Sequence, residues 1–415
     1  MHELLLLVTL GGLLFSSSGR LGIANPFQIY FIIWFSIFFG FYYFKDTFIP
    51  VTDEFLAAVF VSQFSVFAVL IIIFISLKRN IVFGDKLLAP VKNHNYILFA
   101  QIIATSALPL VYLKAISLSG GINIFEVAGY MRLRGAITQD GLTFGFVSYI
   151  SVMSNVITSI SVYMYFCGQI GIWRIFISIV SGLFYVYIGT ARTDVLLILI
   201  LIAVPLILTK VLGIKGIAMT VGVTLLIFVF FASMTAKGIS VDADFADNTV
   251  SFIENMRSYT VAPLLAFSKL YEAGSPVDLG QNTFQIIFAI GKFFGLDISI
   301  VSSSERAYAF VPDPTNVFTV YEVYFRDFSF IGFAAPTFFI LVHWWLYRKA
   351  YKFGGLWIFL YSASVYPLLM QFFQDQYFSL LSMWIQISFW FWLFLHSKIN
   401  FYSQIGKKHA RRSNS

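Results

Sequence analysis

Residues 173–208 read WRIFISIVSGLFYVYIGTARTDVLLILILIAVPLIL, and this stretch decides the fold class of the chain. The apolar runs Trp173–Tyr187 and Val195–Leu208 have the composition of membrane spans, so the polar joint between them, IGTARTD at 188–194, turns at the edge of the hydrocarbon. An arginine or aspartate at the centre of a bilayer costs roughly 2.5–3.5 kcal/mol, and a short turn needs neither residue for its geometry. Arg192 is therefore either an interface anchor or, as we expect, a ligand for an anionic group in the membrane plane.

The composition of the whole chain supports this reading of the stretch. Of 415 residues, 59% are hydrophobic and only 11% are charged, which indicates an integral membrane protein with many spans. In a soluble protein the net charge of +7 would suggest a nucleic-acid partner, but here the basic residues sit mainly in short loops and act as topology signals. We therefore expect no nucleic-acid partner. The single cysteine, Cys167, excludes an intramolecular disulfide, and the N-terminus lacks the pattern of a cleaved signal peptide.

At about 20 apolar residues per span, we expect an all-α polytopic fold with about eleven transmembrane helices in one transmembrane domain, residues 1–415. The expected spans are 3–18, 26–44, 55–77, 96–117, 146–168, 172–189, 194–209, 215–235, 328–347, 355–373 and 377–397.

Lysines and arginines gather in alternate loops, which the positive-inside rule assigns to the cytoplasm. These basic positions are Arg20, the segment 78–92, Arg174, Lys210, Lys215, Arg348, Lys349, Lys352 and the tail 398–415. The N-terminus is then outside and the C-terminus inside, as an odd number of spans requires. The larger outer loops are 118–145 and 236–327, and an apolar piece near 284–296 predicts a helix that lies on or dips into the outer leaflet.

The outer side carries arginines that the positive-inside rule disfavours, and they require an explanation. These residues are Arg132, Arg134, Arg192, Arg257, Arg306 and Arg326. A guanidinium group grips phosphate with two parallel hydrogen bonds and stays charged at any pH, so a lipid diphosphate at the outer leaflet would explain them. For any single outer arginine other than Arg192, a salt bridge such as Arg326 with Asp327, or interface anchoring, is the favoured explanation. Arg132 and Arg134 are two residues apart, so we expect an extended or turning segment in which both point the same way.

Sequence patterns for metals and nucleotides are absent. Asp242, Asp244 and Asp247 resemble a cation-binding run but lack the glycine and the closing glutamate of a calcium loop, so no metal is expected. There is no Walker A sequence, no dinucleotide-binding glycine pattern and no Gly-x-Ser-x-Gly elbow, so no cofactor is expected either. None of the five histidines is placed as an outer general base.

Three segments resemble the Wzy-type O-antigen polymerases, the oligosaccharide repeat-unit polymerase family. They are IGTARTD at 188–194, YMRLRGAITQDGLTFG at 130–145, and NVFTVYEVYFRDFSFIG at 316–332. The last is similar to the family's Asn-x-x-Thr stretch that leads to Asp-Phe-Gly, although Ser329 stands in place of that glycine. The motifs cover about 40 residues, and the topology with a large outer loop late in the chain covers most of the length.

The resemblance implies a GT-C-like glycosyltransferase in the bacterial inner membrane, with the N-terminus periplasmic and the C-terminus cytoplasmic. Such an enzyme transfers a growing glycan from undecaprenyl diphosphate to the non-reducing end of a new lipid-linked repeat unit, without nucleotide or metal. Its partners would be undecaprenyl-diphosphate-linked oligosaccharide, membrane lipid, and a chain-length regulator and flippase of the same pathway.

The same reading assigns roles to individual residues. Arginines placed in advance would stabilise the charge that develops on the leaving diphosphate, and a carboxylate would take the proton of the acceptor hydroxyl. The candidate substrate-binding residues are Arg192, Arg134, Arg132, Arg306, Arg257, Arg326, Asn316 and Tyr324, the tyrosine for stacking against sugars. The candidate catalytic acids are Asp327, Glu322, Asp194 and Glu305, with Asp327 preferred because a span boundary desolvates it.

Two other functions stay open at the level of sequence. A ligase that moves finished glycan onto the lipopolysaccharide core would use the same donor, but it would be expected to show an outer histidine as base. A transporter or flippase for lipid-linked glycan would show charges deep within its spans, paired half-helices or an internal repeat.

Overall fold

The computed structural model describes residues 1–77, 81, 90–213, 215–216, 218–220, 222, 260–274, 277–296, 298, 306–312 and 314–396, apart from the side chains of Arg192 and His396. The described part is almost entirely helical, and one short antiparallel pair, β1 (Ala309–Phe310) with β2 (Pro314–Thr315), is the only sheet in it. The prediction of an all-α membrane protein is therefore confirmed at this level. Long apolar sequences form helices because every backbone polar group in lipid must be satisfied within the chain.

The long helices follow the apolar runs of the sequence closely, and shorter helices such as α6 and α13 lie between them. They are α1 (His2–Ser16), α2 (Pro26–Tyr43), α3 (Asp53–Ser76), α4 (His94–Ser106), α5 (Leu108–Leu118), α6 (Val127–Thr138), α7 (Val147–Phe166), α8 (Ile172–Gly189), α9 (Arg192–Leu208), α12 (Gln285–Phe293), α13 (Tyr321–Phe328), α14 (Ala335–Phe353), α15 (Leu356–Leu369) and α16 (Leu381–His396). Three short 3₁₀ helices join them: η1 (Lys45–Thr47), η3 (Ser329–Ala334) and η4 (Met370–Phe372).

Six of the described helical segments are long and apolar enough to cross a membrane, and four shorter apolar helices accompany them. Ten of the expected spans coincide with these segments, among them 96–117, which is the consecutive pair α4 and α5. That pair breaks at Ala107, just before Pro109, since a proline cannot donate the helical hydrogen bond. The span expected at 215–235 lies largely outside the described residues, so the total of eleven stays a prediction.

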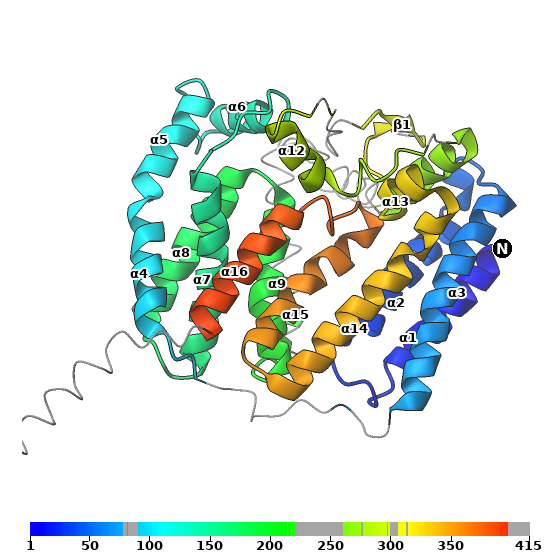
Figure 1. Cartoon of the computed structure of the whole chain (residues 1–415), viewed down its shortest axis with the longest axis horizontal. Coiled ribbons are helices and arrows are strands. Elements are labelled where there is room, and N and C mark those ends of the chain that lie inside the picture. The colour runs from blue at the N-terminus through cyan, green and yellow to red at the C-terminus, as the bar shows by residue number, and fades with distance from the viewer. Residues whose placement is uncertain are drawn as a thin grey trace, which may run out of the picture.

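The apolar helices stand side by side as a bundle, and a layer of short elements covers one end of it (Figure 1). This layer contains α6, α12, the β1–β2 pair and α13, and we call this side of the molecule the polar end. The central helix α15 packs against α2, α9, α14 and α16, and its buried residues include Phe359, Tyr361 and Tyr366. Consecutive spans run in opposite directions along the bundle. The joint before α9 and the turn before α16 therefore also lie at the polar end.

The opposite end is basic in the part of the chain that the structure describes. Its turns 17–25, 90–93, 167–171, 209–213 and 354–355 contain no aspartate or glutamate, but they include Arg20, Lys92 and Lys210. Near this end Lys349 lies over the rings of Trp345, Phe353 and Trp357, at 5.1 to 5.7 Å from their centroids. Aromatic rings and snorkelling lysines of this kind are typical of a membrane–water interface.

The loop 118–145, which is expected on the outer side, differs in structure from the sequence expectation. Residues 127–138 form helix α6 instead of an extended or turning segment. Two positions apart on a helix correspond to a rotation of about 200°, so Arg132 and Arg134 cannot point the same way, and that prediction is wrong. Helix α6 is held down by Tyr130, which is buried with its ring centroid 5.0 Å from that of Tyr187 on α8.

Candidate functional site

The polar end brings two arginines onto one glutamate. Glu322 and Arg326 are one turn apart on α13, and Arg326 Nε contacts Glu322 Oε1. Arg306, from the segment that precedes β1, places its Nε 3.0 Å from the same oxygen, and the side chains of Arg306 and Glu322 are only 8% and 5% exposed. A charge pair this deeply covered is costly unless further hydrogen bonds support it.

That support comes from Asn282 and Asp327. Asp327 is completely buried, and it accepts hydrogen bonds from the backbone N–H groups of Asn282 (3.1 Å) and Thr283 (2.6 Å) and from the Asn282 side chain (2.9 Å). The Asn282 side-chain oxygen then accepts a hydrogen bond of 2.8 Å from Arg306 Nη2. Asp327 thus fixes the segment that orients Arg306. Both of its oxygens are occupied within the protein, so the geometry favours Glu322 over Asp327 as the residue that meets a substrate.

We expect Asp327→Asn to destabilise the protein by about 1–3 kcal/mol, because the new amide N–H₂ would face backbone donors that the carboxylate now satisfies. Thermal unfolding of the detergent-solubilised protein measures this as a lower Tm. The matched control is Asp140→Asn, whose side chain is on the exposed loop after α6. A variant with unchanged Tm and no activity would instead support the role as base that the sequence suggested.

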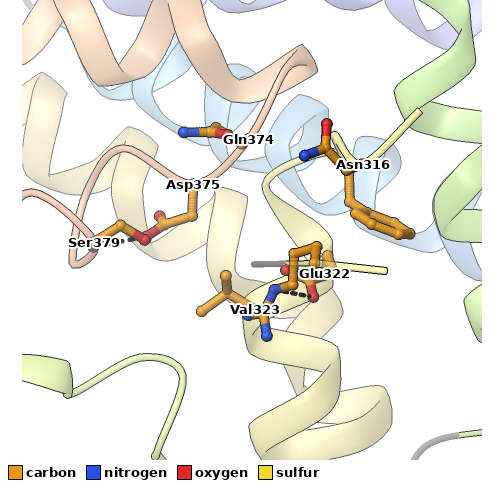
Figure 2. A pocket seen from close by; sticks show the side chains of 8 residues that line it. Asn316, Glu322, Val323, Gln374, Asp375 and Ser379 are labelled. Carbon is orange, nitrogen blue, oxygen red and sulfur yellow. Dashed lines mark hydrogen bonds and ion pairs between the residues drawn. The ribbon is translucent and has the colours of Figure 1, made fainter. Parts of the chain in front are cut away.

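A pocket opens beside the Arg306–Glu322 pair, and Figure 2 shows Glu322 and Asp375 on its walls. Its empty volume, including space open to solvent, is about 250 Å³, and its lining residues are Arg306, Asn316, Phe318, Glu322, Val323, Gln374, Asp375 and Ser379. Both arginine contacts are made to Glu322 Oε1, so among the described residues Oε2 keeps no protein partner. Thr283, Gln285 and Thr319, which are close in sequence to Asn282 or Phe318, each hold a buried polar atom without a hydrogen bond. Buried groups of this kind need a partner, and a polar ligand would supply one.

Asp375 is the site residue that the sequence analysis missed. It is 2% exposed and accepts four hydrogen bonds: from the Tyr324 hydroxyl (2.7 Å), the Tyr377 N–H (3.1 Å), and both the N–H (3.0 Å) and the hydroxyl (2.9 Å) of Ser379. Burial raises the pKa of this carboxyl group, while those donors oppose the rise. A charged residue in a short turn between two apolar helices is the same signal that marked Arg192.

The charges around the pocket suit a neutral, hydroxyl-rich ligand better than a phosphate. Near Arg306 lie Arg326 and three acids, Glu322, Asp327 and Asp278, and Asp375 adds a fourth acid on the pocket wall. Burial lowers the pKa of the Arg306 guanidinium, and Glu322 opposes this. A diphosphate would meet more negative than positive charge here, whereas sugar hydroxyls can donate to carboxylates and accept from the guanidinium.

The remaining predicted residues are spread over the polar end. Asn316 lines the pocket. Tyr324 is 4% exposed and packs against Phe339 and Phe378, so its ring cannot stack on a sugar as the sequence suggested. Its hydroxyl group serves the site instead, by holding Asp375.

The joint before α9 is connected to the Asp375 turn by contacts between side chains. Tyr366 hydrogen-bonds the side chain of Thr193, and its hydroxyl lies 3.4 Å from Gln376, next to Asp375. Asp194 is in the first turn of α9, and a Cβ at Gly189 would come within 2.8 Å of its carboxylate, so a larger residue there would require the Asp194 side chain to move. Helix α9 begins at Arg192, whose side chain is not described. Arg257, Glu305 and the acidic run at 242–247 lie outside the described residues.

A second, wider hollow lies beside α6, with an empty volume of about 770 Å³. Its lining residues are Leu118, Ser119, Gly120, Met131, Arg132, Gly135, Ala136, Gln139 and Asp140. It therefore includes Arg132 but not Arg134. Within the described ranges no group of three histidine, cysteine or acidic side chains is arranged to hold a metal ion. Comparison of the chain with family models, with curated proteins and with solved structures gave no match.

Proposed function

We propose that this chain is an O-antigen polymerase of the Wzy type, a GT-C-like glycosyltransferase that joins undecaprenyl-diphosphate-linked repeat units. The observation that carries the proposal is the covered Arg306–Glu322 pair, which lines a polar pocket where a bundle of apolar helices ends. A lipid-linked sugar has its headgroup at this depth and its chain in the bilayer.

The proposed reaction needs a base and a way to stabilise the leaving group. A hydroxyl at the non-reducing end of the acceptor loses its proton to Glu322 Oε2, and its oxygen forms a bond to the anomeric carbon of the donor sugar. The bond between that carbon and the diphosphate breaks, and undecaprenyl diphosphate leaves with the electron pair. Arginines aimed at the diphosphate would lower the barrier by stabilising this charge.

The two tasks fall to different residues. The acids of the Arg306 pocket fit the acceptor sugar, with Glu322 as base, Asp375 as a further acceptor of sugar hydroxyls and Arg306 as a donor. The diphosphate is then left to the other arginines predicted from the sequence to bind it. Arg192 at the start of α9 is the leading candidate, with Arg132 and Arg134 on α6.

The proposal extends to topology: eleven spans in a bacterial inner membrane, the polar end facing the periplasm, the N-terminus on that side and the C-terminus in the cytoplasm. The basic, acid-free turns at the opposite end support this orientation.

Cysteine labelling tests the orientation directly. In a Cys167→Ala background, we expect Asp140→Cys to react with a membrane-impermeant thiol reagent in intact spheroplasts, and Lys92→Cys to react only after the membrane is opened. Both positions are exposed at opposite ends of the bundle, so they are matched controls for each other. Labelling of Lys92→Cys in closed cells contradicts the orientation.

The function itself is tested by lipopolysaccharide from a deletion strain. A core that carries a single repeat unit is the expected result, because ligation then continues without polymerisation. A bare core contradicts the proposal and indicates a ligase or a flippase instead.

A further inference from the structure

A continuous chain of hydrogen bonds runs through the bundle directly beneath the pocket. It connects Trp34 on α2, Gln371 in η4, Tyr377 in the turn before α16, His343 on α14 and Ser364 on α15. The distances are 3.2, 2.7, 2.9 and 3.1 Å in that order. His343 is 2% exposed, and a polar side chain buried in a membrane-spanning helix is a candidate for function.

The chemistry of each group fixes the direction of this chain. The indole of Trp34 can only donate, so the side-chain oxygen of Gln371 accepts and its nitrogen donates to the Tyr377 oxygen. At the other end, Ser364 donates its hydroxyl hydrogen to the Tyr361 carbonyl (2.7 Å), so its oxygen accepts from His343 Nδ1. His343 therefore carries its proton on Nδ1, and Nε2 accepts the hydroxyl hydrogen of Tyr377.

The chain is attached to both walls of the pocket. The backbone carbonyl of Gln371 accepts a 2.8 Å hydrogen bond from the N–H of Val320. Val320 is the residue just before α13, the helix that contains Glu322. On the other wall, the N–H of Tyr377 donates to Asp375, and the Tyr377 ring stacks on Phe339 with centroids 3.7 Å apart. Loss of a hydrogen bond in this chain would therefore change the positions of both pocket carboxylates, Glu322 and Asp375.

We infer that His343 and Tyr377 are positioning residues, which hold the Asp375 turn and the start of α13 in the arrangement that forms the sugar pocket. The role in catalysis rests on the proposed function, but the positioning itself does not. His343 accepts from Tyr377 through Nε2 only, so a side chain with an acceptor at that place keeps the turn in position.

The first experiment measures the turn without reference to activity. In a Cys167→Ala background, Gln374→Cys reports the accessibility of the turn through its rate of reaction with a thiol reagent in detergent. We expect His343→Leu and Tyr377→Phe each to raise this rate about tenfold. Each removes one buried hydrogen bond, and such a loss shifts the equilibrium between the ordered and the open turn by about tenfold. His343→Gln places a carbonyl oxygen near the position of Nε2 and is expected to keep the rate within about twofold of the parent, whereas His343→Asn is too short and resembles His343→Leu.

The matched control is Tyr185→Phe, which removes another buried tyrosine hydrogen bond, to the Ala104 carbonyl, away from the pocket. Equal labelling in this control and in Tyr377→Phe overturns the inference, because the effect is then general loosening. Parent-like labelling in both His343→Leu and Tyr377→Phe overturns it as well.

The second experiment compares O-antigen ladders from cells with equal amounts of each variant. We expect His343→Gln to retain ladders and His343→Asn to lose them, which is a pattern of rescue that loss of folding alone does not give. If labelling follows the expected order while the parent chain makes no ladder in a deletion strain, the proposed function fails and the positioning role stands. If ladders are equal in His343→Gln and His343→Asn, the link from His343 to catalysis fails.

Discussion

Glu322→Gln is expected to abolish polymerisation and to leave a lipopolysaccharide core with a single repeat unit. An amide cannot accept the proton of the acceptor hydroxyl, and loss of a general base costs about 10²–10⁴-fold in rate. The substitution also leaves Arg306 and Arg326 without the carboxylate that both contact. Electrophoresis of lipopolysaccharide from a complemented deletion strain measures the result.

The control for this prediction is Glu272→Gln, an exposed glutamate in the helical residues 260–273 at the same end of the molecule. Its ladder is expected to match that of the parent. Glu322→Asp provides a finer comparison, because it keeps the carboxylate but withdraws it from both arginines, and we expect partial activity. Normal ladders from Glu322→Gln, in cells with equal protein, would remove Glu322 from the reaction and return attention to Asp327.

Arg192→Ala is expected to abolish polymerisation too, and Arg192→Lys to impair it severely. Lysine keeps the charge but loses the planar fork that binds two phosphate oxygens at once. Removing one preorganised donor to a developing negative charge costs about 10²–10³-fold in rate. Arg348→Ala is the matched control, since Arg348 is an exposed arginine of α14 toward the opposite end of the bundle. Full ladders from Arg192→Ala would identify Arg192 as an interface anchor.

Because Arg306 and Arg326 pair with Glu322, the structure separates them from the other arginines that the sequence assigned to diphosphate binding. From sequence the outer arginines form one set for diphosphate binding, but these two are already satisfied by a carboxylate. Double variants test this division of labour. We expect that substituting Arg306 or Arg326 does not restore activity to Glu322→Gln, because the double variant still lacks the Glu322 carboxylate that acts as base.

The amino-acid sequence by itself determined the membrane class and the positions of the apolar helices. These properties depend on local composition, because about 20 apolar residues in succession are stable only as a helix in lipid. The apolar helices between 2 and 208, and between 335 and 396, accordingly lie where the hydropathy of the sequence placed them, whereas α6 does not follow from hydropathy.

Only the tertiary structure decided which polar residues meet. Arg306 and Glu322, Asn282 and Asp327, or His343 and Tyr377 are separated by 16 to 45 positions, and no periodic pattern relates the members of a pair. From sequence, Asp327 is preferred as base because it stands at the boundary of an expected span, whereas the fold buries it against Asn282 and Thr283. Asp375 and His343 have no assigned role at the level of sequence, since an isolated acid in a turn and a histidine in a span show their partners only when the helices pack. The identity of a site in a membrane bundle depends on these contacts between helices, and they follow from packing that local sequence does not encode.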